Sequence, residues 1–101
     1  MARILVACAN GAGSSLLMKM AVEKATDRLG IPVSNIHHCS LSEGVSSAHQ
    51  YDVVFVPLNF LSMYDGAKDD GVMVIGMRNV TSDKEAEEKL IENGAVEKFK
   101  R

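Results

Sequence analysis

The sequence predicts an α/β fold in which a four-stranded parallel sheet lies between two layers of helices. Short apolar runs recur along the 101 residues and alternate with stretches whose apolar residues recur at helical spacing. The clearest runs, residues 3–8 and 53–56, are nearly continuous, as is typical of strands covered on both faces. We therefore expect a single domain, residues 1–101, with three layers and helices on both faces of the sheet.

The first apolar run is expected to be the central strand, and it ends at Cys8. A helix is expected from residue 14 to about residue 29, because apolar residues fall on one side and charged residues on the other. The apolar side comprises Leu17, Met18, Ala21, Val22, Ala25 and Leu29. Gly30 and Pro32 are expected to end this helix, since neither residue continues a helix readily.

Three further strands are expected along the chain. Residues 33–40 predict a less hydrophobic strand suited to a sheet edge, and residues 41–50 predict a polar connection with a short helix. Residues 53–56 predict a buried strand that Pro57 closes, because proline cannot donate to the ladder. Residues 72–75 predict the fourth strand, which follows a turn signal.

The last part of the chain is expected to be mainly helical. Residues 58–64 predict a short helix or a turn, and residues 76–79 predict the loop after the fourth strand. Ser82 and Glu85 have the spacing of a capping box for a last helix, which Gly94 weakens or ends. This helix is expected to turn three residues inward: Ala86, Leu90 and Ile91.

Short loops between alternating strands and helices favour right-handed crossovers and a flavodoxin-like strand order of 2-1-3-4. Ligand sites in such sheets lie beyond the carboxyl ends of the strands, where the strand order reverses. Here that point lies between the first and third strands. The loop after Cys8 and the loop of residues 57–59 are expected to meet there.

Charge and composition exclude several classes of function. The net charge is -2 with only 11 Lys and Arg, which argues against a nucleic-acid surface or a polybasic membrane patch. No apolar run approaches the ~18 residues of a membrane span, and the first residues do not resemble a signal peptide. We expect a cytoplasmic protein in which Cys8 and Cys39 are reduced thiols.

Cys8 is the strongest candidate for a reactive residue. A thiolate is the reactive form of cysteine, and a nearby helix N-terminus favours it. The glycines after Cys8 let successive amides converge on one point, and the serines add hydroxyl donors. We expect a solvent-reachable thiolate in a phosphate cradle of seven residues: Ala9, Asn10, Gly11, Ala12, Gly13, Ser14 and Ser15.

Residue types alone leave a second interpretation open, in which Cys8 is a buried small hydrophobe and the glycines only make a tight turn. The loop is not a dinucleotide-binding fingerprint, because Leu16 stands where the third glycine belongs. It is not a P-loop either, since no Lys-Ser or Lys-Thr pair follows.

A resemblance to a known family favours the first interpretation. The loop and the following helix contain Cys8-Ala9-Asn10-Gly11-Ala12-Gly13-Ser14-Ser15 and then Met18-Lys19-Met20. This segment resembles the phosphocysteine loop of enzyme IIB of the bacterial sugar phosphotransferase system, in the ascorbate-type branch of the lactose/ascorbate/galactitol group. Residues 74–79 are similar to the segment after the fourth strand in that branch.

The resemblance implies an enzyme, a protein-phosphocysteine sugar phosphotransferase, and no cofactor. In the family, IIB takes a phosphoryl group from a phosphohistidine of enzyme IIA and passes it to a sugar bound by the membrane permease IIC. Carried over to this sequence, Cys8 is the phosphorylated residue and residues 10–15 form its cradle. Ascorbate is the sugar that the branch implies.

The main alternative is a low-molecular-weight tyrosine phosphatase or a related arsenate reductase, which also has a nucleophilic cysteine after the first strand. Those families have the pattern Cys-x5-Arg-Ser/Thr, and here Ser14 stands where their phosphate-clamping arginine belongs. Without that arginine, hydrolysis of a phosphomonoester loses its principal charge clamp. The pattern therefore favours transfer over hydrolysis.

Other residues have a functional and a structural interpretation each. Arg78, after the fourth strand, is a candidate contact for the phosphoryl group or a partner, or else an exposed loop arginine. Leu16 and Met20 are candidates for a docking patch, or else are covered by a neighbouring loop. His37 and His38 are adjacent on a strand and point to opposite faces, so no metal site is expected.

Overall fold

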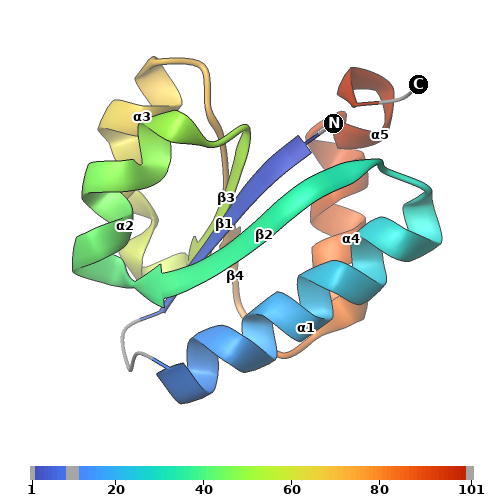
Figure 1. Ribbon diagram of the computed structural model, residues 1–101, viewed down its shortest axis with the longest axis horizontal. Helices are drawn as coiled ribbons and strands as arrows, with labels where there is room; N and C mark the ends of the chain where they lie inside the picture. Colours follow the sequence, from blue (N-terminus) through green and yellow to red (C-terminus); the bar gives the residue numbers. More distant parts are fainter. Residues whose placement is uncertain (1, 9–11, 100–101) are drawn as a thin grey trace.

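The computed structural model describes residues 2–8 and 12–99. Four parallel strands form one sheet in the order β2-β1-β3-β4 (Figure 1), which confirms the predicted order. The strands are β1 (Ala2–Cys8), β2 (Val33–Ser40), β3 (Val53–Pro57) and β4 (Met73–Met77). The predicted second strand has the same bounds as β2. The predicted first strand begins one residue later than β1, and the predicted third strand ends one residue earlier than β3.

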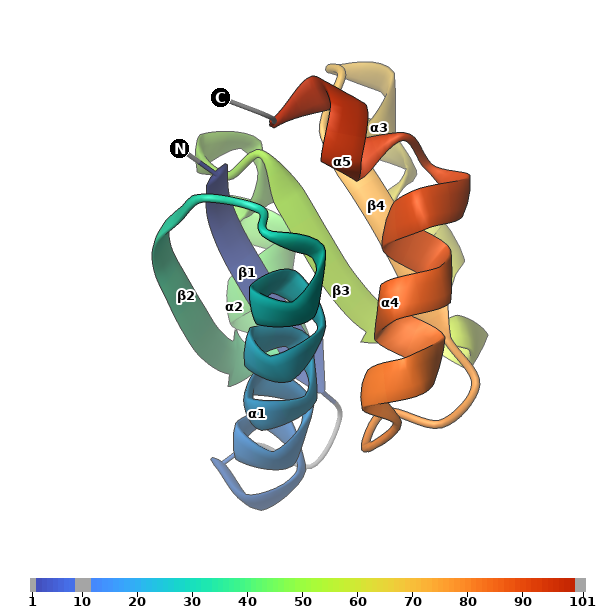
Figure 2. The same cartoon turned by 90° about the vertical axis from the view of Figure 1, so that its right-hand side faces the viewer.

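Helices cover both faces of the sheet, as predicted. One face carries α1 (Ala12–Leu29), α4 (Asp83–Glu92) and α5 (Ala95–Lys98). The other carries α2 (Leu41–Ser47), α3 (Asp65–Asp69) and the 3-10 helices η1 (Ala48–Gln50) and η2 (Leu58–Tyr64). Figure 2 shows α1 and α4 side by side over the sheet. The sequence did not predict α3.

Alternation along the strands builds two cores. Ile4 and Val6 of β1 face α1 and α4, whereas Leu5 and Ala7 face α2, η2 and α3. Successive side chains of a strand point to opposite faces, so a continuous apolar strand serves both layers. This explains why the central strands lack an alternating polar pattern.

An ion-pair cluster joins the two helices on the α1 face. The Arg28 guanidinium donates to Asp83 at 2.7 Å and to Glu87 at 3.4 Å. Asp83 raises the pKa of Arg28 above its ordinary value. Partial desolvation acts to raise the pKa of Asp83, but the charge and hydrogen bond of Arg28 outweigh it and lower that pKa overall. The cluster therefore links the end of α1 to the start of α4.

The fourth strand runs two residues beyond the prediction, because Gly76 and Met77 continue the ladder with β3. A Cβ atom on Gly76 would lie 2.9 Å from Cδ1 of Leu58, so glycine lets η2 pack against the strand. From the sequence, Gly76 was expected to lie in a loop. In the structure it lies in a strand, at a point where a neighbouring element approaches the backbone closely.

The prediction that Leu17 and Ile91 face the core is wrong, because each side chain is about half exposed. The buried stripe of α1 runs through Ser15, Met18 and Val22, which leaves Leu17 on its flank. Ile91 follows the buried Leu90 directly, and one residue on a helix turns the side chain about 100° away from the core.

Half of the predicted capping box is present at the start of α4. Ser82 accepts the backbone N–H of Glu85 at 3.1 Å, as expected. The carboxylate of Glu85 accepts the backbone N–H groups of Arg78 and Asn79, at 2.7 and 2.8 Å. Glu85 therefore ties the loop after β4 to α4. Gly94, at φ +75°, ends the helix as predicted.

Candidate active site

Cys8 is the last residue of β1 and lies at the carboxyl edge of the sheet, as predicted. Helix α1 begins at Ala12, two residues earlier than expected, so residues 12–15 form its first turn. Figure 1 shows the end of β1 and the start of α1 at the same end of the molecule. The first N–H groups of a helix lack intrahelical acceptors and favour an anion. The predicted cradle residues Ala9, Asn10 and Gly11 lie outside the described residues.

The thiol of Cys8 is buried, and the expectation of a solvent-reachable sulfur is wrong for this structure. Its exposed fraction is 2%, and it belongs to the core between the sheet and α1. The thiol donates to the Sδ atom of Met18 at 3.4 Å. Long side chains on a helix point back toward its N-terminus, which brings Met18 over the end of β1.

Ser15, the last predicted cradle residue, is fully buried, with an exposed fraction of 0%. Its Oγ atom lies 3.1 Å from Nδ1 of His38 on β2. His38 pairs with Val6 in the ladder, so its ring lies on the same sheet face as Cys8, two residues further along. From the sequence, His38 was considered only as a metal ligand and was not connected to the Cys8 loop. The register of β2 against β1 was the missing information.

Leu16 and Met20 are exposed, at 46% and 47%. Leu17 between them is also exposed, so three large apolar side chains lie on the first turns of α1 near the end of β1. Among residues 2–8 and 12–99, no loop buries them, in contrast to the structural interpretation of the sequence. Contact with a partner remains a prediction for these residues.

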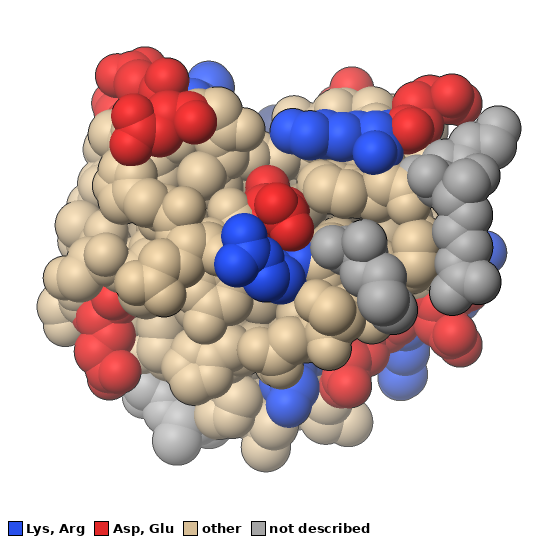
Figure 3. All heavy atoms as spheres, turned by 45° about the horizontal axis from the view of Figure 1, so that its top comes forward, with Lys and Arg blue, Asp and Glu red and all other residues tan. Residues whose placement is uncertain are grey.

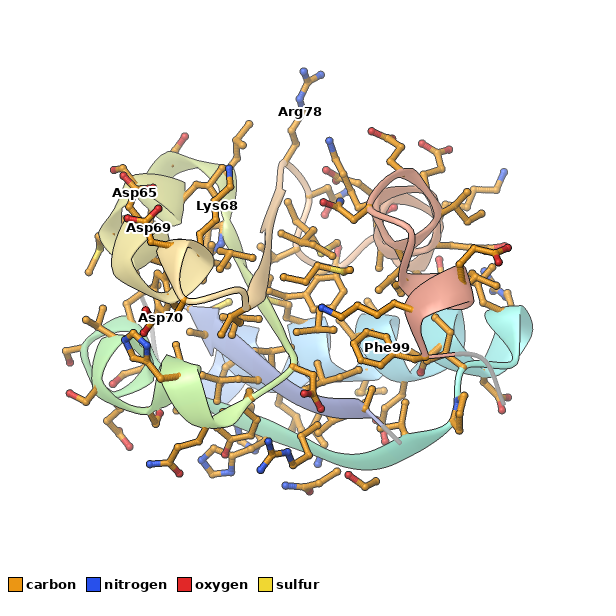
Figure 4. All side chains as sticks on the ribbon, turned by 90° about the horizontal axis from the view of Figure 1, so that it is seen from above. Asp65, Lys68, Asp69, Asp70, Arg78 and Phe99 are labelled. Atoms are coloured by element: carbon orange, nitrogen blue, oxygen red, sulfur yellow. The ribbon has the colours of Figure 1, made fainter. Side chains whose placement is uncertain are left out.

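Arg78 follows β4, which is separated from β1 by β3. Its backbone N–H donates to Glu85, and its side chain points away from the sheet in Figure 4. The structure therefore places Arg78 at the correct edge of the sheet but does not bring it to Cys8. The exposed-loop interpretation fits this placement.

Cys39 lies on the face opposite Cys8, next to Ala7 in the ladder. Burial, with smaller contributions from Glu43 and Cys8, raises the pKa of the Cys39 thiol. A raised pKa reduces the thiolate fraction, so Cys39 is a poor nucleophile. Cys39 packs in the core on this face of the sheet.

Charges of both signs are interspersed on the face that Figure 3 shows. Helix α3 carries the acidic side chains of Asp65 and Asp69 together with the basic side chain of Lys68 (Figure 4). Within residues 2–8 and 12–99, no three His, Cys, Asp or Glu side chains gather as a metal-binding group. No helix in the described part of the chain is long and apolar enough to span a bilayer.

Known proteins similar to this chain share its fold and much of its length. A solved lactose-specific IIB domain of the phosphoenolpyruvate:carbohydrate phosphotransferase system from Streptococcus pneumoniae superposes with a TM-score of 0.65 at 20% identity. The superposition covers 91% of this chain and 96% of that one, and it shows that the two share a fold.

Curated relatives are similar in sequence. The ascorbate-specific EIIB component of Mycoplasma pneumoniae is 27% identical over 88 residues, which is 86% of this chain and 88% of the relative. The corresponding component of Escherichia coli O157:H7 is 29% identical over 90 residues, 89% of this chain and 86% of the relative. Neither comparison favours the phosphatase alternative.

The family model for the lactose/cellobiose-specific IIB subunit of the phosphotransferase system matches residues 3–92. That match spans every strand of the sheet and helices α1 to α4. The chain therefore belongs to the lactose/cellobiose-specific IIB subunit family of the phosphotransferase system.

Proposed function

We propose that this chain is a cytoplasmic phosphoryl carrier in which Cys8 is the phosphorylated residue. It accepts the group from a phosphohistidine of an enzyme IIA and passes it to a sugar bound by a membrane permease IIC. The observation that carries the proposal is the position of Cys8, at the end of β1 and directly before the N-terminus of α1. Membership of the IIB family supports it.

The transfer step exchanges one phosphorus bond for another. The Cys8 thiolate attacks phosphorus, the S–P bond forms, and the P–N bond breaks with its electron pair remaining on the donor imidazole. The proton that the thiol loses passes to water, and the imidazole is reprotonated from water. No general base is needed in the loop, because catalysis rests on in-line positioning and charge stabilisation.

Main-chain donors stabilise the transferred group in this proposal. The phosphoryl oxygens accept from the N–H groups of residues 9–15, the last four of which form the first turn of α1. Ser14 and Ser15 are proposed to add hydroxyl donors. The partial positive charge of the α1 N-terminus favours both the thiolate and the phosphoryl dianion.

The buried position of Cys8 requires one movement before transfer. The thiol faces Met18 in this structure, and the attacking sulfur must face the incoming phosphorus. Rotation about χ1 of Cys8 to another staggered rotamer turns Sγ from Met18 toward the loop. We propose that this structure represents the resting state of the carrier.

The permease makes the sugar contacts in such a system, so the sugar is proposed by similarity. The curated relatives are named as ascorbate-specific, and ascorbate is the substrate to test first. Leu16 and Met20, exposed beside the end of β1, are the residues we propose for contact with IIA or IIC.

The test is phosphoryl transfer from a radiolabelled phosphohistidine form of an ascorbate-type IIA. The wild-type chain and the matched control Cys39→Ser should take up label, and Cys8→Ser should take up none. Label in Cys8→Ser would remove Cys8 from the mechanism, and its loss in Cys39→Ser would show that transfer also needs Cys39. Steady hydrolysis of an aryl phosphate by the isolated chain would instead support the phosphatase alternative.

A further inference from the structure

A hydrogen bond connects the first turns of α1 to the edge strand β2. It joins Oγ of Ser15 to Nδ1 of His38 at 3.1 Å. Ser15 is completely buried, and His38 is partly exposed. The tautomer and protonation state of the ring decide whether the Ser15 hydroxyl donates to Nδ1 or accepts from it.

The same pair lies next to the thiol. Met18, which accepts from Cys8, follows Ser15 by three residues, so both side chains project from one face of α1. Ser15 is one turn nearer to the helix N-terminus, where the phosphoryl group is proposed to bind. Its hydroxyl, bonded to His38, therefore belongs to the turn that is proposed to bind the phosphoryl group.

We propose that His38 is a positioning residue, which acts through Ser15 to control how tightly a phosphoryl group is held on Cys8. This inference rests on the proposed function of Cys8 as the acceptor. It assigns a role to a histidine that the proposed transfer step does not use.

The hydrogen between Oγ and Nδ1 belongs either to Ser15 or to His38. When Nδ1 has a lone pair, the Ser15 hydroxyl donates to His38 and turns its own lone pairs toward other groups. When Nδ1 carries a hydrogen, it donates to Oγ, and the Ser15 hydroxyl hydrogen turns to another acceptor. A phosphoryl dianion offers only acceptors, so the second arrangement holds it better.

Protonation of His38 produces this second arrangement and adds a positive charge. Binding of the phosphoryl dianion and binding of this proton therefore favour each other, as linkage requires. The phosphorylated state is expected to take up a proton on His38. Retention of the phosphoryl group should weaken as the pH rises and this proton is lost.

Other ionisable groups lie on the elements that pack beside β2. Helix α1 contributes Lys19 and Glu23, which line a groove of 680 Å³ between α1 and β2. Strand β1 contributes the thiol of Cys8, and α2 contributes Glu43 near its start. Strand β2 contributes His37, whose ring centroid lies 6.3 Å away and whose side chain leaves from the opposite face. His37 is therefore the matched control.

The experiment measures the equilibrium of phosphoryl exchange between the IIA donor and the wild-type chain, His38→Asn or His37→Asn. Asparagine keeps a nitrogen near the position of Nδ1 but does not titrate. Over about pH 5–8, the equilibrium constant should fall about tenfold more in the wild type and in H37N than in H38N. Identical profiles for H38N and H37N would overturn the role of His38.

Ser15→Ala tests whether the effect passes through the hydroxyl. In the Ser15→Ala background, the His38→Asn substitution should change the pH profile no further. Fully additive effects of the two substitutions would contradict the proposed coupling.

A measurement on the wild type avoids any dependence on how the variants fold. Ring nitrogen NMR should show Nδ1 of His38 gaining a proton when Cys8 is phosphorylated, at a constant pH near 7. The His37 ring should not change. No change at His38 would overturn the inference. Failure of the wild type to accept label on Cys8 would overturn the proposed function and this inference together.

Discussion

The Sγ atom of Cys8 lies 3.4 Å from the Sδ atom of Met18, within the core between the sheet and α1. The nucleophile of the proposed transfer is therefore held away from solvent at rest. A thioether is a weak hydrogen-bond acceptor, so little free energy is needed to break the bond between Cys8 and Met18. Because oxidation of a thiol depends on its exposure, burial at this position limits access of oxidants to the sulfur.

Met18→Leu should speed alkylation of Cys8 by iodoacetamide about two- to fivefold. Leucine conserves the volume but removes the sulfur acceptor, and a weak hydrogen bond of this kind is worth about 0.5–1 kcal/mol. Alkylation rates are measured by mass spectrometry. Met63→Leu, at an exposed methionine on η2, should leave the rate unchanged. An unaltered rate in Met18→Leu would show that this contact does not restrain the thiol.

Gly44→Ala should lower the free energy of unfolding by about 1–3 kcal/mol, the usual cost of overpacking. A Cβ atom at this position would overlap the hydroxyl of Tyr64 and lie 3.1 Å from the Cβ of Ala7. Chemical denaturation measures the difference.

Gly66→Ala is the matched control for this substitution. A Cβ atom added at Gly66 would meet no neighbouring atom within 4 Å. Gly66 lies in α3, where alanine is the better helix former, so the free energy of unfolding should stay the same or rise slightly. Equal destabilisation by the two substitutions would refute the packing described around Tyr64.

Tyr64→Phe should destabilise the protein near neutral pH by about 1–3 kcal/mol, because the buried carbonyl of Leu41 loses its donor. The Tyr64 hydroxyl donates to that carbonyl at 2.8 Å. Tyr51→Phe, at a partly exposed tyrosine, is the control. Unfolding by urea at pH 7 gives both values.

The same tyrosine predicts how stability changes in alkali. Burial, with a smaller contribution from Cys39, raises the pKa of Tyr64 above its ordinary value of 10.0. The folded state then keeps a proton that the unfolded state loses, so this stability is complete below about pH 10 and is lost above it. Tyr64→Phe should lose less stability between pH 9 and pH 11, about one unit on each side of that value. A parallel decline in both proteins would contradict this assignment.

Arg28→Gln should reduce stability at neutral pH and low salt, because Asp83 and Glu87 lose their shared partner. Desolvation opposes the shift, but Arg28 lowers the pKa of Asp83 overall, so the pair stabilises the protein above the unfolded pKa of Asp83. The difference between variant and wild type should therefore shrink as the pH falls through the carboxylate range. It should also shrink in high salt. Thermal melts over pH and salt check both trends.

The sequence was sufficient to predict the sheet because each buried strand is a continuous apolar run bounded by a turn signal. It misjudged Leu17 and Ile91 because periodicity identifies a stripe but not its edges. The end of β4 was missed because Gly76, a turn residue by type, serves a close contact with Leu58. Local patterns do not contain this kind of information.

The candidate site was predictable in part for the same reason. A cysteine at the end of a strand, followed by glycines and a helix, is a local signal, and β1 and α1 lie where it indicates. The burial of Cys8 beneath Met18 and the bond between Ser15 and His38 depend on the packing of α1 and the register of β2. These are long-range properties, which no single segment of sequence contains.

The most direct test of the central claim is tandem mass spectrometry of the chain after incubation with a phosphohistidine-bearing IIA. The account predicts a phosphoryl group on the peptide that contains Cys8, bound through sulfur, and its disappearance when sugar and permease are added. A phosphoryl group found only on His37, His38 or His49, with Cys8 unmodified, would contradict it.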